Sequence, residues 1–257
     1  MNTTTSPFYI AARESGSTSS DLPLWASRTE NPLPLHAKAQ KSVERVEVEN
    51  VPGAFQLLDV LSADESAAFL SATDEMGYTE DAAVSLGRHI RHNNNLNWII
   101  DTTTERMIWQ RIQPVFDRAD PNFGGYTPLG LNQRFRFYRY GVGDFFSFHT
   151  DGSWPGSQVI DGKPVADAFG DRYSLYTLLV FLNDDFEGGE TQFLIDPDDS
   201  DKPARNPNQA NISNVRTPAG SVLCFPHGTH PLHCLHGSAK ITAGVKDIIR
   251  TDVLFSL

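Results

Sequence analysis

Hydrophobic and polar residues alternate along most of the second half of the chain, a pattern that is typical of β-strands. Short turns rich in Gly, Asn and Asp interrupt this pattern. The pattern predicts strands at 132–140, 145–149, 173–182, 192–195, 222–226 and 245–257. Residues 173–182 are almost continuously apolar, so we expect that strand to be central and buried on both faces.

Two short strands and a helix are predicted ahead of this region. Residues 43–51 and 55–60 show strand-like alternation. Ser62 and Glu65 have the spacing of a capping box, in which each side chain bonds the other residue's backbone N–H. The apolar residues that follow predict a helix that stops near Gly77.

A second helix is predicted from Thr104 to Asp120, because apolar residues recur there at helical spacing. Helices followed by many short strands predict a mostly β fold with supporting α-helices, a double-stranded β-helix or jelly roll. We expect one domain over 41–257, with strand-and-helix support at 41–129 and the jelly-roll core at 130–257.

The remaining segments are predicted to be irregular. Residues 1–40 are rich in Ser, Thr, Pro and Asn, which indicates a flexible N-terminal arm. Residues 88–101 mix basic and amide side chains, which suit either a loop or substrate contacts. Residues 152–172 form a long connection typical of lids or inserts. The aspartates within 196–216 lack the glycine and distal glutamate of an EF-hand, so a solvated loop is expected there.

Composition narrows the classes of partner. The net charge is −11, from 21 Lys+Arg against 32 Asp+Glu, which argues against a nucleic-acid partner. No apolar run is long enough for a membrane span, and no signal peptide is recognised at the N-terminus, so a cytoplasmic protein is expected. The only cysteines, Cys224 and Cys234, suit a reducing compartment. Asn211 begins a glycosylation sequence, but an ordinary polar loop explains it without a secretory signal.

His149 and Asp151 are the first candidates for metal binding. They lie two residues apart at the end of a predicted strand, so both side chains can point to the same face. A third ligand would complete the two-histidine, one-carboxylate face that holds Fe(II) and leaves positions open. The pair alone also suits ordinary turn chemistry. Candidates for the third ligand follow downstream at His227, His230, His233 and His236.

Two further features bear on this site. Lys246 and Arg250 share one face of the last predicted strand, where a cation could hold an anionic co-substrate. A zinc cluster of Cys224, Cys234 and the histidines is the alternative, but structural zinc sites use closely paired ligands and these cysteines are ten residues apart.

Several motifs together resemble one enzyme family. They are YGVGDFFSFHTD at 140–151, FLNDDFEGGETQF at 181–193, HGS at 236–238, GVK at 244–246 and RTDVLF at 250–255. In this order they resemble the prolyl 4-hydroxylase branch of the Fe(II)/2-oxoglutarate-dependent dioxygenases. The resemblance covers residues 130–257 clearly and 43–129 more loosely.

The resemblance implies a role for each matching residue. His149, Asp151 and His236 would bind iron, and Lys246 would pair with the distal carboxylate of 2-oxoglutarate. His236 is favoured because it stands ten residues before Lys246, while His233 is second and His227 and His230 are expected to be loop residues. Tyr140 either adds a hydrogen bond to the same carboxylate or packs in its strand.

Other residues on the predicted inner faces are candidates for ligand contacts. Arg136, Tyr138 and Arg250 could bind the primary substrate or the co-substrate, with Arg250 assigned first to the co-substrate and Arg136 and Tyr138 to the substrate. Ion pairs with Asp252 or Glu190 are the alternative for either arginine. Trp154, in the connection after the iron ligands, is either part of a lid or a buried anchor.

The resemblance implies an enzyme that uses Fe(II), 2-oxoglutarate and O2, with ascorbate as a possible reductant. We expect hydroxylation of an unactivated C–H bond, with release of succinate and CO2, and first of all in a prolyl residue of a peptide. A free amino acid or another small molecule is the alternative substrate. A non-catalytic jelly-roll binding module is the alternative from another class, and oligomeric state is left open.

Overall fold

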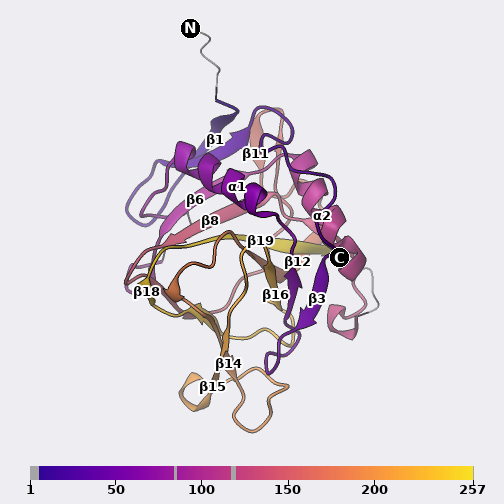
Figure 1. The fold of residues 1–257 in the computed structure, drawn as a ribbon, viewed down its shortest axis with the longest axis vertical. Coiled ribbons are helices and arrows are strands. Elements are labelled where there is room, and N and C mark those ends of the chain that lie inside the picture. Colours follow the sequence, from indigo (N-terminus) through magenta and orange to yellow (C-terminus); the bar gives the residue numbers. More distant parts are fainter. Residues whose placement is uncertain (1–5, 84–85, 117–119, 257) are drawn as a thin grey trace.

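Two mostly antiparallel sheets face each other in the computed structural model, which describes residues 6–83, 86–116 and 120–256 (Figure 1). The larger sheet contains, in spatial order, β1 (Phe8–Glu14), β2 (Leu22–Ser27), β6 (Asn94–Ile99), β8 (Arg134–Tyr140), β19 (Lys246–Ser256), β12 (Arg172–Phe181), β16 (Val222–Pro226), β4 (Phe55–Leu58) and β3 (Glu44–Glu47), with β7 (Pro128–Leu131) also paired with β19. The smaller sheet contains β15 (Asn211–Val215), β14 (Thr191–Ile195), β17 (His236–Ser238), β9 (Phe145–His149) and β5 (Arg91–His92). Two strand pairs complete the set, β10 (Gln158–Ile160) with β11 (Lys163–Val165), and β13 (Glu187–Gly188) with β18 (Ile241–Ala243). The predicted jelly-roll architecture is confirmed.

The two long helices support the larger sheet from outside. The helix α1 (Ala63–Met76) begins with the predicted capping box of Ser62 and Glu65 and ends before Gly77. The helix α2 (Thr102–Phe116) begins slightly earlier than predicted. Its predicted end lies partly outside the described residues, and Asp120 instead caps the 3-10 turn η1 (Pro121–Phe123).

The hydrophobic core lies on both faces of the larger sheet. One cluster joins the helices to the sheet through side chains such as Phe69, Ile112 and Phe137. The second fills part of the space between the two sheets and includes Phe181 and Phe193. The predicted central strand is therefore confirmed, because β12 pairs with β16 and β19 and contributes to both clusters.

The N-terminal segment differs from the predicted flexible arm. Residues of β1 and β2 form an antiparallel pair, and β2 extends the larger sheet by pairing in parallel with β6. Alternate side chains of β2 are buried, namely Leu22, Leu24 and Ala26. This otherwise polar segment therefore contains a short amphipathic strand. That burial is what fixes the segment to the sheet.

Three segments that were predicted to be irregular also contain regular structure. Residues 88–101 include all of β5 and β6, residues 152–172 include the hairpin β10–β11, and residues 196–216 include β15 and the 3-10 turn η2 (Pro207–Gln209). These strands are short and carry many polar residues, so their alternation is weak in the sequence.

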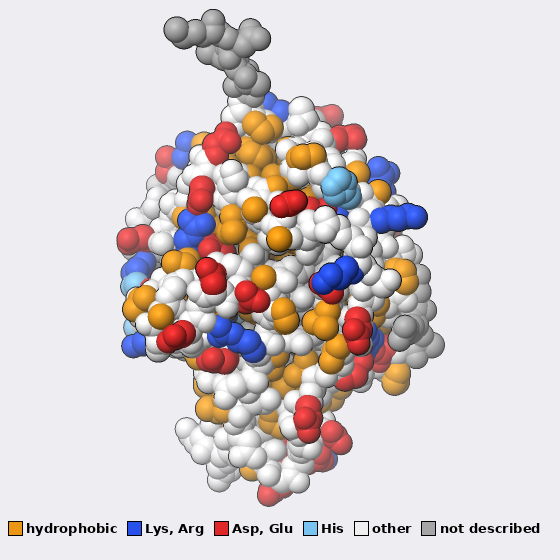
Figure 2. All heavy atoms as spheres, in the orientation of Figure 1, with side chains coloured by type: hydrophobic (Ala, Val, Ile, Leu, Met, Phe, Trp, Pro, Cys, Tyr) orange, Lys and Arg blue, Asp and Glu red, His pale blue; other side chains and the backbone are white. Residues whose placement is uncertain are grey.

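Charged side chains of both signs are interspersed on the face of the molecule in Figure 2, without a uniformly basic area. Within the described ranges, no helix has the length and apolar character needed to cross a membrane.

Candidate active site

His149, Asp151 and His236 meet in a cavity between the two sheets. His149 at the end of β9 is paired directly with His236 at the start of β17, and Asp151 follows two residues after His149. One Asp151 oxygen lies 3.7 Å from His149 Nε2, and the other lies 3.5 Å from His236 Nε2. Their ligand atoms all lie within 4.8 Å of one another, and among the described residues this is the group whose donors suit a metal ion.

Backbone carbonyls fix the tautomers of both histidines. His149 Nδ1 lies 2.9 Å from the carbonyl oxygen of Ser147, and His236 Nδ1 lies 3.3 Å from that of Cys234. A carbonyl oxygen can only accept, so each Nδ1 carries a proton and each Nε2 presents a lone pair toward the cavity. Burial, with a smaller contribution from His236, lowers the pKa of His149 to about 4, which keeps this ring neutral at neutral pH.

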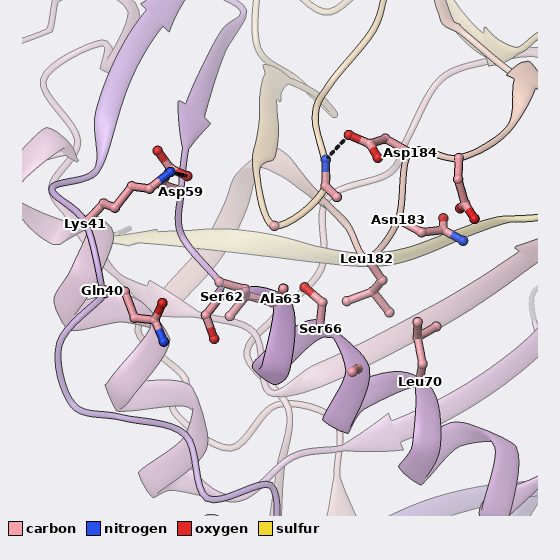
Figure 3. A pocket seen from close by; sticks show the side chains of 15 residues that line it. Gln40, Lys41, Asp59, Ser62, Ala63, Ser66, Leu70, Leu182, Asn183 and Asp184 are labelled. Carbon is pink, nitrogen blue, oxygen red and sulfur yellow. Dashed lines mark hydrogen bonds and ion pairs between the residues drawn. The ribbon is translucent and has the colours of Figure 1, made fainter.

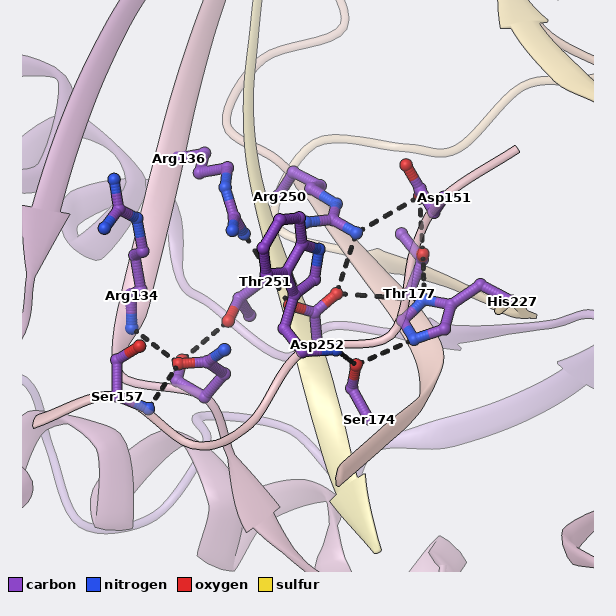
Figure 4. A network of polar contacts seen from close by, with 12 residues as sticks. Arg134, Arg136, Asp151, Ser157, Ser174, Thr177, His227, Arg250, Thr251 and Asp252 are labelled. Atoms are coloured by element: carbon purple, nitrogen blue, oxygen red, sulfur yellow. Dashed lines mark hydrogen bonds and ion pairs between the residues drawn. The ribbon is translucent and has the colours of Figure 1, made fainter. Parts of the chain in front are cut away.

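A directed hydrogen-bond chain holds the carboxylate of Asp151 (Figure 4). Thr177 Oγ1 donates to Asp151 Oδ2 at 2.6 Å and lies 2.7 Å from His227 Nδ1. His227 Nε2 lies 2.9 Å from Ser174 Oγ, which accepts from the backbone N–H of Trp154 at 2.8 Å. Because the Thr177 proton is used on Asp151, His227 donates from Nδ1 and accepts at Nε2 from Ser174. This series of hydrogen bonds therefore links the backbone of the 152–172 segment to the carboxylate of Asp151.

Arg250 lies on the other side of the same carboxylate. Its Nη2 is 3.4 Å from Asp151 and 2.9 Å from Asp252, and its side chain is buried. Burial acts to raise the pKa of Asp151, but the charge of Arg250, followed by His236, holds that pKa well below its usual range. Asp151 is therefore an anion at neutral pH, as a metal ligand requires.

The side chain of Lys246 is buried and lines the same cavity. Its Nζ donates to the Gly189 carbonyl at 2.6 Å and to Ser238 Oγ at 3.1 Å. It forms no ion pair within the part of the chain that the structure describes. Burial, aided by Arg216, lowers the pKa of Lys246 to about 7. An anion at this position would restore the charged form of the amine.

Of the other predicted ligand-contacting residues, Tyr138, Tyr140 and Arg250 line this cavity, and Arg136 and Trp154 do not. Tyr140 and Tyr138 line it from β8, and Tyr140 is paired directly with Lys246 across the strands. Arg136 faces Arg250 across the same pair of strands. Trp154 is 40% exposed and lies beside Arg136, whose guanidinium carbon is 5.5 Å from the centre of its ring, so it is not a buried anchor.

The remaining histidines lie apart from the cluster. His233 contacts Arg205 and the carbonyl of His230, while His230 contacts the carbonyl of Asn122. His227 lies in the loop after β16, as predicted, but its ring is buried and contacts Thr177, the residue that bonds Asp151. The sequence signal for this network was Ser174 and Thr177, two hydroxyl residues within an otherwise apolar central strand.

A larger cavity elsewhere has different chemistry. It lies between the start of α1 and the turn after β12, and its lining includes Lys41, Asp59 and Asp184 (Figure 3). Lys41 and Asp59 already pair at 2.8 Å, and this lining shares no residue with that of the metal-ligand cavity. Size therefore does not identify the active site.

Comparisons with known proteins find one related sequence and solved structures of similar fold. No protein-family model matches the sequence. A PKHD-type hydroxylase of Stenotrophomonas maltophilia (strain R551-3) is 26% identical over 205 residues, which cover 76% of this chain and 79% of that protein. A prolyl hydroxylase from Trichoplax adhaerens, solved with a hypoxia inducible factor peptide fragment, has a TM-score of 0.52 at 16% identity and covers 81% of this chain and 84% of its own. A Pseudomonas putida prolyl-4-hydroxylase has a TM-score of 0.47 at 16% identity, covering 79% of this chain and 92% of that one.

The Trichoplax adhaerens structure supports the fold, and the Stenotrophomonas maltophilia protein supplies the similarity in sequence. Together they confirm the predicted resemblance: the chain is similar to the prolyl hydroxylase branch of the Fe(II)/2-oxoglutarate-dependent dioxygenases.

Proposed function

We propose that this protein is an Fe(II)- and 2-oxoglutarate-dependent oxygenase that hydroxylates a C–H bond of its substrate. The observation that carries the proposal is the cluster of His149, Asp151 and His236, with both Nε2 lone pairs directed to one cavity and a buried Lys246 in the same cavity. Two histidines and one carboxylate are the donor set of non-haem iron oxygenases.

The side chains that line the cavity fit both an iron ion and 2-oxoglutarate. His149, Asp151 and His236 would hold the iron, and the unpaired ammonium of Lys246 would take the distal carboxylate of 2-oxoglutarate. Ser238 would keep the amine directed into the cavity, since its hydroxyl already contacts Nζ. Tyr140 lines the wall between them, and Arg250 acts on Asp151 and Asp252 more directly than on the co-substrate.

When bound, Fe(II), 2-oxoglutarate and O2 supply the oxidising power for hydroxylation, with succinate and CO2 as co-products. The chain supplies the surroundings for that chemistry. Thr177 and Arg250 keep Asp151 anionic and oriented, and the apolar walls from Phe146, Leu179 and Ile248 limit access of water. Ascorbate would serve as an external reductant.

A prolyl residue in a peptide is the first substrate to test. The support is the prolyl hydroxylase with a peptide fragment among the structural neighbours, together with the partly exposed Trp154 beside the cavity. The substrate would enter past the 152–172 connection, whose Trp154 backbone is linked to Asp151 through the hydrogen-bond chain.

The test is anaerobic titration of the purified protein with Fe(II) and 2-oxoglutarate, while the visible metal-to-ligand charge-transfer band is recorded. We expect a band in the wild type and in His233→Ala, whose ring contacts Arg205 outside the cluster. We expect none in His149→Ala or His236→Ala. A wild-type protein that binds iron without developing the band would contradict the proposal and favour a non-catalytic binding module.

A further inference from the structure

A small recess rich in arginine adjoins the metal-ligand cavity. Its polar lining, here called the arginine recess, contains no acidic residue and consists of Arg91, Asn95, Asn97, Arg134, Arg136 and Tyr138. Tyr138 lines the metal-ligand cavity as well, so the two spaces meet at this side chain.

The pairing of strands explains why these side chains gather. Asn97 on β6 is opposite Arg136 on β8, and Arg136 is opposite Arg250 on β19. Residues directly opposite in a sheet point to the same face, so the three form a row across the inner face. Asn95 and Tyr138 form the next row toward Lys246. The arginine recess is therefore built on rigid strands beside the site.

The charges around Arg136 are unbalanced. Arg134 already pairs with Glu14 at 2.6 Å. The nearest carboxylate to Arg136 is Asp252 at 3.6 Å, and Asp252 also pairs with Arg250 at the shorter distance of 2.9 Å. With Asp151 assigned to the metal, two buried guanidinium groups share one carboxylate. Arg136 Nη1 has no hydrogen-bond partner in the described part of the chain.

Such an arrangement is costly unless a ligand completes it. A buried charge without a full set of partners loses hydration that the protein does not replace. A guanidinium group offers two parallel donors that match the two oxygens of a carboxylate. Asn97 adds an amide group that can donate to or accept from a neighbouring polar group of the same ligand, whereas the amide of Asn95 already bonds Asn93 through both its nitrogen and its oxygen.

We propose that the arginine recess binds a carboxylate of the primary substrate, so that the enzyme selects acidic substrates and presents a carbon near this group to the metal. Arg136 is the central specificity residue, and Trp154 lies beside its guanidinium. The inference rests on the proposed oxygenase function and narrows its substrate class. The carboxylate is either the free α-carboxylate of an amino acid or peptide terminus, or an acidic side chain within a peptide.

The experiment compares acids with their neutral amides as ligands of the protein loaded anaerobically with Fe(II) and 2-oxoglutarate. N-acetyl-L-proline and its primary amide test the α-carboxylate. The capped dipeptides prolyl-glutamate and prolyl-glutamine test the acidic side chain. Calorimetry gives each dissociation constant, and the charge-transfer band is recorded first for every variant.

We expect one of the two acids to bind at least about tenfold more tightly than its amide, as a charge-assisted bidentate contact predicts. Arg136→Gln should remove this preference and keep the band, Arg136→Lys should keep part of it, and the exposed control Arg28→Gln should retain all of it. A thermal unfolding curve for each variant checks that it is folded.

Three results would overturn the proposal. They are the absence of a preference for either acid in the wild type, a preference that survives Arg136→Gln, and loss of the 2-oxoglutarate band in Arg136→Gln, which would assign this arginine to the co-substrate. If the wild type itself lacks the band, the proposed oxygenase function fails first. The same acid and amide comparison on metal-free protein then still tests the arginine recess.

Discussion

Thr177 is the residue that joins Asp151 to the buried part of the protein. Its hydroxyl donates its one proton to Asp151 and accepts a hydrogen bond from His227. Partners of this kind orient a ligand and tune its affinity for metal without touching the ion.

Thr177→Val therefore should weaken metal binding. Valine keeps the shape of threonine but leaves Asp151 Oδ2 and His227 Nδ1 without their shared partner. We expect the Fe(II) dissociation constant to rise about 10- to 100-fold in competition with a chelator. Thr177→Ser keeps the hydroxyl and should remain close to the wild type. Equal affinities for the valine and serine variants would show that Thr177 does not position Asp151.

Lys246 predicts a pH dependence for co-substrate binding. Its pKa is lowered to about 7 in the free site, so the amine loses its proton as the pH rises above 7. Binding of a carboxylate then requires uptake of a proton, and the affinity for 2-oxoglutarate should fall by up to about tenfold per pH unit between pH 7 and 9. The measurement is the titration of the charge-transfer band at several pH values.

Lys246→Arg is the matched control, because arginine does not deprotonate in this range. This variant should bind 2-oxoglutarate with a flat pH profile. Lys246→Met should bind it weakly at every pH. A wild-type profile as flat as that of the arginine variant would contradict the assigned role.

At the scale of residues, the sequence predicted much of the site but not what surrounds it. His149, Asp151, His236 and Lys246 stood out because their spacing matches a family, and the structure brings all four to one cavity. The role of His227 was not evident from the sequence, because its contact with Thr177 joins positions 50 residues apart. Only the folded sheet brings such pairs together.

At the scale of elements, the pairing of β17 with β9 sets the separation of the two histidines. Gly237 lies at this contact, where an added Cβ would come within 2.6 Å of the Phe146 carbonyl oxygen. A methyl group at this position cannot be accommodated unless the strands move apart.

Gly237→Ala should therefore weaken metal binding by separating His236 from His149. We expect a loss of about tenfold or more in Fe(II) affinity, and a decrease of about 1 to 3 kcal/mol in the free energy of unfolding. Gly141→Ala is the control, since its nearest neighbour would be 3.8 Å away. Chelator competition and denaturant unfolding measure the two effects, and unchanged metal affinity in Gly237→Ala would contradict this account.

Elements with clear periodicity were predicted correctly, including the short strands β9, β14 and β16, whereas the short strands rich in polar residues were not. The helix α1, with its capping box, and the strands β8, β12 and β19 all have clear patterns. β5 has two residues and β6 contains three asparagines, so residues 88–101 resembled a loop. These strands exist because β8 and β9 provide partners for their backbone groups, which is information from tertiary structure.

At the scale of the whole molecule, Glu105 couples global stability to pH. It lies on α2 and accepts the backbone N–H of Leu131 on β7 at 2.8 Å. Burial raises the pKa of its carboxyl from 4.5 to about 7. Between these values the native state binds more protons than the unfolded state, so this group lowers stability as the pH rises, and its full cost is present above pH 7.

Glu105→Gln should remove that cost while keeping an oxygen for Leu131. We expect the variant to be more stable than the wild type at pH 8, by on the order of 2 kcal/mol, and the difference to shrink toward pH 5. Denaturant unfolding across this pH range tests the expectation, with Glu49→Gln as an exposed control. A difference that does not change with pH would show that Glu105 titrates normally.

The N-terminal strand pair has a consequence for any shortened form of the protein. A chain that began after residue 27 would end the larger sheet at β6, with the backbone groups that now pair with β2 open to solvent. It would also lack Glu14, the partner of Arg134 at the arginine recess. Such an open edge invites pairing between molecules. A truncation designed to remove a polar tail would instead yield a self-associating protein with an altered charge beside its active site.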